Sequence, residues 1–174
     1  MEDLSLHILD IAENSAKAGA RRILIAVNEN ERRDRLTFRV TDDGRGMSRE
    51  EQDRALDPFF TTGRKRTGLG LPLLAQTAEL CGGRLTIDSK PGRGTRVAAA
   101  FPYSHVDRPP LTHMAETLMT LIFGHPGIDI GYRHTRNRLT FNILHKGRSG
   151  GTQAAEIMAV RRSLREGLAR IGAS

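Results

Sequence analysis

The sequence has 174 residues, of which 38% are apolar and 27% are charged, and its formal net charge at pH 7 is +7. This length allows a buried core in one domain, or in one domain with a small appendage, and the composition excludes fibrous and disordered proteins. No apolar run is long enough to cross a bilayer, and the acidic start Met1-Glu2-Asp3 lacks the basic region of a secretion signal. We therefore expect a cytoplasmic protein without a membrane span.

The first predicted element is a helix over residues 4–19. Leu4, Ile8 and Ile11 recur at helical spacing and predict a face turned to the core, and Gly19 ends the helix. The opposite side carries a polar stripe that consists of Asp3, His7, Asp10, Asn14 and Lys17. Because this stripe gathers carboxylates, an amide and two nitrogen bases, it is the first candidate site. His7 could take part in this site, but we interpret it as a surface histidine, which is the more common case on such a stripe.

Alternating apolar residues then predict a β-hairpin, with strands at 22–28 and 36–40 around a polar turn. After a glycine-rich segment at 41–47, Ser48 and Glu51 have the spacing of a capping box, which predicts a short helix. The elements predicted next are, in order, a loop at 59–67, a helix at 68–80, and strands at 85–89 and 95–101 on either side of a turn.

The segment beyond Pro102 differs in charge from the rest. Residues 1–102 hold 17 basic and 15 acidic residues, whereas residues 103–174 hold 10 and 5. The pattern of this second segment predicts a helix at 111–123, a hairpin at 128–144 and a helix at 153–171. We therefore expect a core over residues 1–102 and a C-terminal α-β-β-α appendage over residues 103–174, which packs on the core or docks a partner.

Four short motifs follow one another along the core. They are His7-x-x-Asp10-x-x-Glu13-Asn14-Ser15, Asp42-x-Gly44-x-Gly46, Phe59-Phe60 and Gly68-Leu69-Gly70-Leu71. In this order they resemble the N, G1, F and G2 boxes of the GHKL superfamily, which includes histidine kinases, anti-sigma serine kinases, gyrase-type ATPases and mismatch-repair ATPases. The resemblance implies the Bergerat fold, an α+β fold built as a two-layer α/β sandwich. It makes residues 1–102 a histidine-kinase-like ATP-binding domain of a stand-alone bacterial member.

The resemblance also implies ATP and Mg²⁺ as cofactors. Mg²⁺ takes few protein ligands and fills its shell with phosphate oxygens and water, so the amide oxygen of Asn14 suffices as its protein ligand. Asp10 lies one helical turn before Asn14, where a carboxylate could orient or deprotonate the group that attacks the γ-phosphate. Relatives usually carry Glu at this position, and a solvated carboxylate is the alternative interpretation of the shorter Asp10. Asn14 alone would be read as an ordinary polar residue of a solvated helix face.

Asp42 directly follows a predicted strand. An ionised carboxylate only accepts hydrogen bonds, which suits the exocyclic amino group of adenine rather than the carbonyl of guanine. Gly44 and Gly46 allow the backbone to approach the base or to adopt positive φ, and Met47 offers a flexible apolar surface beneath it. The alternative is a plain Asp-Gly turn between strands.

Gly68 and Gly70 begin a predicted helix, where free backbone N–H groups and the helix dipole favour an anion such as phosphate. Arg64 and Lys65 precede this helix and could neutralise the triphosphate, although such charge runs are usually solvated loops. Thr95 resembles a further position of the family, and a residue with high β-propensity at the start of a strand is an equal explanation. The full set that the resemblance assigns to ATP is Asn14, Lys17, Asp42, Gly44, Gly46, Met47, Phe60, Arg64, Lys65, Thr67, Gly68, Leu69, Gly70, Leu71 and Thr95.

Three functional hypotheses follow. The favoured one is an ATP:protein phosphotransferase, either an anti-sigma-like serine kinase or a detached histidine-kinase catalytic domain, which phosphorylates a separate partner protein. The second is a binding module that ATP and ADP switch with little turnover, and the short lid between Phe60 and Gly68 and the Asp at position 10 favour it. Nucleic-acid binding through the basic tail is the least favoured, because no aromatic platform accompanies the charge.

The partner of this protein is expected to be another chain. The sequence begins at the first motif, so we expect the group that is phosphorylated to come in trans. The C-terminal segment also offers a surface through which a homodimer could form.

Overall fold

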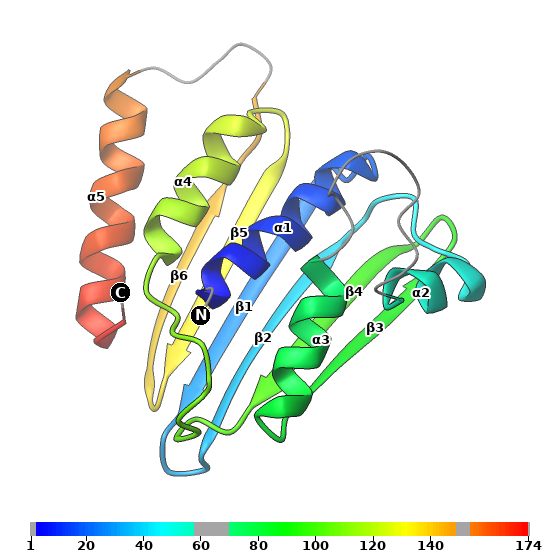
Figure 1. Cartoon of the computed structure of the whole chain (residues 1–174). Coiled ribbons are helices and arrows are strands. Elements are labelled where there is room, and N and C mark those ends of the chain that lie inside the picture. The colour runs from blue at the N-terminus through cyan, green and yellow to red at the C-terminus, as the bar shows by residue number, and fades with distance from the viewer. Residues whose placement is uncertain (1–2, 58–69, 149–153, 174) are drawn as a thin grey trace.

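The computed structural model describes residues 3–57, 70–148 and 154–173. The described residues form five helices and six strands (Figure 1). In chain order the elements are α1 (Leu4–Lys17), β1 (Arg22–Asn30), β2 (Arg35–Asp42), α2 (Arg49–Ala55), α3 (Gly70–Leu80), β3 (Arg84–Lys90), β4 (Gly94–Phe101), α4 (Met114–Gly124), β5 (Asp129–Arg136), β6 (Leu139–His145) and α5 (Ala154–Ile171). None of these helices combines the length and the apolar character that crossing a bilayer requires.

The six strands belong to one sheet with the order β3-β4-β2-β1-β5-β6. β1 and β5 run parallel, whereas every other pair of neighbours is antiparallel. The helices α1, α3 and α4 lie on the same face of this sheet (Figure 1). The molecule is therefore an α+β sandwich of one helix layer on one sheet layer, as the sequence predicted.

The core lies between the two layers. In β1, Ile23, Ile25 and Val27 are buried beneath the helices, while the residues that alternate with them face the other side of the sheet. From α1, Leu4 and Ile8 are fully buried against this face. Because the helices of the described residues cover one face of the sheet, the strands keep the alternation of apolar and polar residues that made them recognisable in the sequence.

The segment after Pro102 continues this sheet. β5 pairs with β1 along its whole length, from Arg22 opposite Asp129 to Glu29 opposite Arg136. α4 contacts α1, where Thr117 Oγ1 donates to the backbone carbonyl of Ser5 over 3.3 Å. The expected α-β-β-α order is confirmed, and its strands share one sheet and one core with the strands before Pro102. The division into two units at residue 102 stays a prediction.

Two residues of the predicted polar stripe on α1 do not lie at the surface. His7 is 4% exposed, so our interpretation of it as a surface histidine was wrong. Asp3 is the N-cap of α1: its Oδ1 accepts from the backbone N–H of Ser5 over 2.8 Å, and its Oδ2 accepts from that of Thr112 over 3.0 Å. Asp3 bonds the segment before α4, and the periodicity of α1 alone could not reveal this long-range contact.

A buried chain of polar side chains joins β1 to β5. His134 is fully buried, and its Nε2 lies 2.7 Å from Glu29 Oε1 while its Nδ1 lies 2.7 Å from the hydroxyl of Tyr132. Burial and the charge of Glu29 raise the pKa of Tyr132 well above its usual value, so its hydroxyl keeps its proton and can donate it to Nδ1. Nε2–H then donates to Glu29 Oε1, so both ring nitrogens of His134 have a partner.

Candidate functional site

Asp42 is the last residue of β2 and lies on the helix-covered side of the sheet, on the same side as Val40 and Phe38. Its Oδ2 accepts from Ser15 Oγ on α1 over 2.6 Å. Its Oδ1 accepts from the backbone N–H of Gly44 over 2.8 Å and from that of Thr95 over 3.3 Å. Three separate segments therefore fix one half-buried carboxylate, and the bond from Gly44 is the Asx turn that an Asp-x-Gly sequence favours.

The glycines after Asp42 allow this loop to lie against the turn between β3 and β4. Gly46 has φ of 68°, and a Cβ atom at this position would come within 1.9 Å of the carbonyl oxygen of Lys90. Gly44 is buried, and a Cβ atom there would lie 3.0 Å from the carbonyl oxygen of Ala18 at the end of α1. Gly46 thus has the positive φ that the sequence allowed, and the close neighbour of both glycines is the protein's own backbone. Their approach to a base stays a prediction.

Ser89 links Met47 to Thr95 by hydrogen bonds. The backbone N–H of Met47 donates to Ser89 Oγ over 2.8 Å, and Ser89 Oγ lies 2.8 Å from Thr95 Oγ1. Ser89 also bonds the carbonyl of Gly94 over 3.0 Å, so the loop after β2 and the start of β4 are held together by one buried hydroxyl. Sequence reasoning named Met47 and Thr95 but missed Ser89, whose only signal was a serine at a core-facing position of a strand.

Asp10 and Gly70 lie beside each other at the start of α3. A Cβ atom at Gly70 would come within 3.2 Å of Asp10 Oδ2, so the carboxylate lies against the first residue of that helix. Leu71 follows and packs, half-buried, against the core. A helix begins with backbone N–H groups that have no partner inside the helix, and the positive end of its dipole lies there. The exposed carboxylate of Asp10 therefore borders a place suited to anions.

α1 connects these two regions. Its Asp10 borders Gly70, its Ser15 bonds Asp42, and the carbonyl of Ala18 at its end accepts from the backbone N–H of Arg45 over 2.9 Å. Asn14 and Lys17 are exposed and lie on this helix between Asp10 and the loop after β2. The structure thus brings Asp10, Asn14 and Lys17 onto one helix that contacts both the Asp42 loop and α3.

Other predicted residues lie outside the described part of the chain. These are Phe60, Arg64, Lys65, Thr67, Gly68 and Leu69, together with Phe59 of the third motif.

A scan against protein-family models matches residues 2–105 to the histidine kinase-, DNA gyrase B- and HSP90-like ATPase family. The chain belongs to this family. The match contains all four motifs and the end of β4, so the order of motifs predicted the family correctly. This histidine-kinase-like ATPase domain ends, by the family model, before α4 begins.

Among curated proteins, the domain is similar to several sensor kinases. It is 33% identical over 95 residues to the alginate biosynthesis sensor protein KinB of Pseudomonas aeruginosa, a match that covers 53% of this chain and 16% of KinB. It is 31% identical over 97 residues to sporulation kinase D of Bacillus subtilis, covering 56% of this chain and 19% of that kinase. It is 40% identical over 85 residues to the cell-division control histidine kinase PdhS of Brucella canis, covering 41% of this chain and 8% of PdhS. The chain thus spans only a small part of the length of these relatives.

Two solved structures share the fold over nearly the whole chain. The MutL ATPase domain of Aquifex aeolicus, complexed with ADP, has a TM-score of 0.57 at 12% identity and covers 95% of this chain and 70% of its own. The N-terminal domain of a DNA repair protein has a TM-score of 0.57 at 13% identity and covers 92% of this chain and 57% of its own. At these identities the likeness concerns the fold alone, and its extent shows that it includes the strands after Pro102.

Proposed function

We propose that this histidine-kinase-like ATPase domain binds Mg-ATP between α1, α3 and the Asp42 loop and transfers the γ-phosphoryl group to a separate protein. The observation that carries the proposal is the fixed carboxylate of Asp42. Ser15 supplies one hydrogen bond to Oδ2, and Oδ1 accepts two, so Oδ2 keeps an acceptor position for one further donor. A carboxylate whose orientation is already fixed binds the amino group of adenine with little further loss of entropy.

The phosphate end of the proposed site lies at Asp10 and Gly70. Phosphates bind favourably at the N-terminus of α3, and the neighbouring Asp10 carboxylate repels them unless a cation lies between. The exposed amide oxygen of Asn14, one turn from Asp10, is a hard donor of the kind that Mg²⁺ prefers, and Mg²⁺ needs few protein ligands beside phosphate oxygens and water. When bound, Mg²⁺ would neutralise charge on the β- and γ-phosphates.

Asp10 is the group that we assign to the transfer itself. If the acceptor is a hydroxyl, its oxygen attacks the γ-phosphorus, the bond from that phosphorus to the β–γ bridging oxygen breaks, and Asp10 accepts the hydroxyl proton. If the acceptor is a neutral imidazole nitrogen, Asp10 accepts a hydrogen bond from the N–H of the same ring and thereby orients it. The products in both cases are ADP and a phosphorylated partner, and the kinases named above support this reaction class. ATP in the cytoplasm would be the donor.

A second function is a switch without turnover. The side chain of Asp10 is one methylene shorter than the Glu common in relatives, which reduces its reach toward an attacking group. In that case ATP and ADP would change the conformation of the nucleotide site and thereby the affinity for a partner. Binding of nucleotide is common to both functions, so it is tested first.

Titration of the purified chain with ATP and Mg²⁺ by calorimetry tests the site. Asp42→Asn places an amide N–H₂ group where the carboxylate would accept, and we expect affinity to fall by about two orders of magnitude, as for a lost charge-assisted bond in a buried site. Asp43→Asn is the matched control, because the Asp43 side chain is exposed and its Oδ1 accepts only from the backbone N–H groups of Arg21 and Arg22. Equal affinities of the two variants would exclude Asp42 from the adenine site.

Incubation with γ-labelled ATP and extract of the source cells separates the kinase from the switch. The kinase predicts a labelled partner band that Asp10→Asn removes while calorimetry shows ATP binding retained. If the protein binds ATP tightly but labels no partner, under conditions where a reference kinase labels its substrate, the result supports the switch without turnover.

A further inference from the structure

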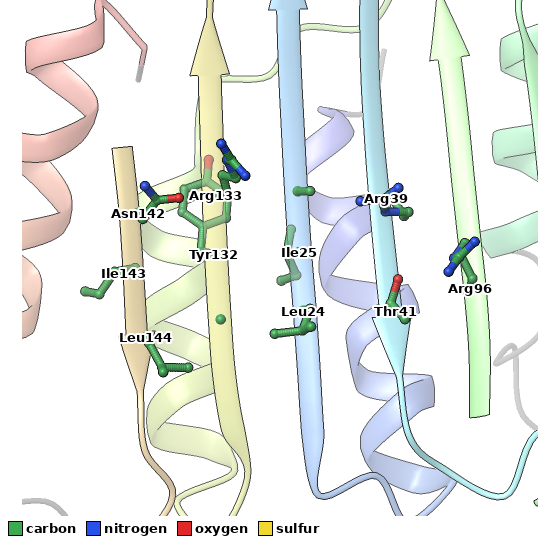
Figure 2. A pocket seen from close by; sticks show the side chains of 12 residues that line it. Leu24, Ile25, Arg39, Thr41, Arg96, Tyr132, Arg133, Asn142, Ile143 and Leu144 are labelled. Atoms are coloured by element: carbon green, nitrogen blue, oxygen red, sulfur yellow. The ribbon is translucent and has the colours of Figure 1, made fainter. Parts of the chain in front are cut away.

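The face of the sheet opposite the helices is basic. In Figure 2 the helices lie behind the sheet, and Arg39, Arg96 and Arg133 stand on the near side. The exposed arginines that alternate onto this face come from four strands and are Arg35, Arg39, Arg84, Arg96 and Arg133. They belong mostly to the strands before Pro102, so exposed basic side chains also gather outside the tail, although the tail holds most of the net excess of positive charge.

The strand register sets the spacing of these arginines. Ala26 of β1 lies opposite Arg39 of β2 on one side and opposite Arg133 of β5 on the other. Ala98 of β4 lies on the far side of Arg39. Two open hollows of about 550 and 570 Å³ lie over these alanines, and they are neighbours because both are lined by Ala26, Arg39 and Arg133. We call the two hollows together the trough.

One end of the trough is aliphatic. Leu24 and Leu144 both lean over Gly131 of β5, because a Cβ atom on that glycine would lie 2.6 Å from Leu24 Cδ2 and 3.7 Å from Leu144 Cδ1. The two leucines are 45% and 56% exposed. Arg96 and Arg133 line the same hollow, so guanidinium groups border an exposed aliphatic patch (Figure 2).

The arginines of the trough have no anionic partners in the described part of the chain. Arg39, Arg96 and Arg133 take part in none of its ion pairs and donate none of its side-chain hydrogen bonds, whereas Arg136 at the end of β5 bonds Glu31 over 3.3 Å. Two carboxylates on this face do not pair with these arginines. Asp88 is the neighbour of Arg96 across the β3–β4 ladder but forms no ion pair with it, and Asp129 is bonded to Lys146 over 2.9 Å. Guanidinium groups present several donors in a planar fork that matches a carboxylate, so this face is complementary to an acidic ligand.

We infer that this trough docks an acidic segment of a partner protein, with carboxylates on Arg39 and Arg133 and an aliphatic side chain packed against the exposed side of Leu24 and Leu144. A second copy of this chain would bring two basic faces together, which like-charge repulsion opposes. Single-stranded nucleic acid binds sheets through exposed aromatic rings, and on this face the described residues include none: Tyr132, Phe38 and Phe101 are buried. The inference does not depend on turnover of ATP, because the trough and the Asp42 site lie on opposite faces of the sheet.

Fluorescence anisotropy with synthetic probes tests the inference on the whole chain. The probes are a glutamate-rich peptide with isolated leucines, the same peptide with serine for leucine, and the same peptide with glutamine for glutamate. We expect the first to bind more tightly than the other two. The double variant Arg39→Ala/Arg133→Ala should weaken its binding by about tenfold or more at low salt, and less as salt screens the charges.

The matched control is Arg161→Ala/Arg162→Ala on α5, which removes the same charge from exposed positions elsewhere and should leave peptide affinity within about twofold. Spectra of ¹³C-labelled leucine methyls should show shifts for Leu24 and Leu144 but none for the buried Leu118. Equal losses in both double variants, equal affinities of the three peptides, or tighter binding of an oligothymidylate that the trough variant abolishes would each overturn the inference. ADP titration of the same variants should be unchanged, so a failed docking test is distinct from a failed nucleotide site.

Discussion

Gly92 lies in the turn between β3 and β4, and Gly94 is the first residue of β4; their φ angles are similar, 74° and 83°, yet their surroundings differ. A Cβ atom at Gly92 would meet nothing within 4 Å, whereas one at Gly94 would lie 2.0 Å from the carbonyl oxygen of Asp42. We predict that Gly92→Ala lowers the free energy of unfolding by roughly 1 to 2 kcal/mol, because alanine is strained in the left-handed backbone conformation but meets no neighbouring atom there. Gly94→Ala must also displace the backbone of Asp42 and should cost more than about 3 kcal/mol.

Urea unfolding of the two glycine variants measures the difference, and titration with ADP shows whether the Asp42 site moved. Because the two substitutions share the same strain in φ, the excess cost of Gly94→Ala reports the close approach alone. Equal unfolding free energies would mean that the turn relaxes without disturbing Asp42.

For single residues, the sequence predicted which residues belong to the candidate site better than it predicted their hydrogen-bond partners. Asp42, Gly44 and Gly46 were recognised from the spacing of one motif. The bond from Ser15 to Asp42 was missed, because it joins residues 27 positions apart and depends on how α1 lies across β2. Ser15 is buried on the core face of α1, and a buried polar side chain needs a partner that only the tertiary structure supplies.

Among the secondary elements, β1 and β5 are joined by the buried chain Glu29–His134–Tyr132. His134→Leu leaves the carboxylate of Glu29, which is 8% exposed, without its hydrogen-bond donor. We predict a loss of about 3 to 5 kcal/mol, as for breaking one partner of a buried pair. Tyr132→Phe removes only the hydroxyl that meets Nδ1 and should cost about 1 to 2 kcal/mol.

Thermal and urea unfolding of these two variants provide the measurement, with Thr135→Val as a control on the other face of β5. Thr135 is partly exposed and bonds only Thr140, at 3.0 Å, so its replacement should change stability little. A loss for Thr135→Val as large as that for His134→Leu would show that any polar change in β5 has this effect.

The strands themselves were predictable, and their order in the sheet was not. Period-two alternation identified the strands of both hairpins, since one face of each strand lies under the helices. The parallel pairing of β5 with β1 brings together residues about a hundred positions apart, and local sequence carries no information on such a register. For the same reason, local sequence patterns do not reveal that exposed arginines of separate strands line one trough.

For the whole molecule, the family model ends at residue 105, but the core does not. Without the segment after that residue, β1 becomes an edge strand, and α1 loses the cover of α4, which supplies the fully buried Leu118 and Leu121. We predict that a fragment of residues 1–105 unfolds without a cooperative transition and binds a dye for exposed apolar surface.

A chain that ends at residue 153 is the matched control for that fragment. It lacks α5, and with it Leu164, Leu168 and Ile171, but keeps all six strands and α4 over the sheet. We expect this shorter chain to melt cooperatively at a lower temperature than the full chain and to bind ADP. If the fragment of residues 1–105 melted as cooperatively as this control, the segment after Pro102 would be a separable appendage. Failure of the fragment alone would mean that the six-stranded sheet is the folding unit, because the shared core and the parallel β1–β5 ladder would then be indispensable to the ATPase domain.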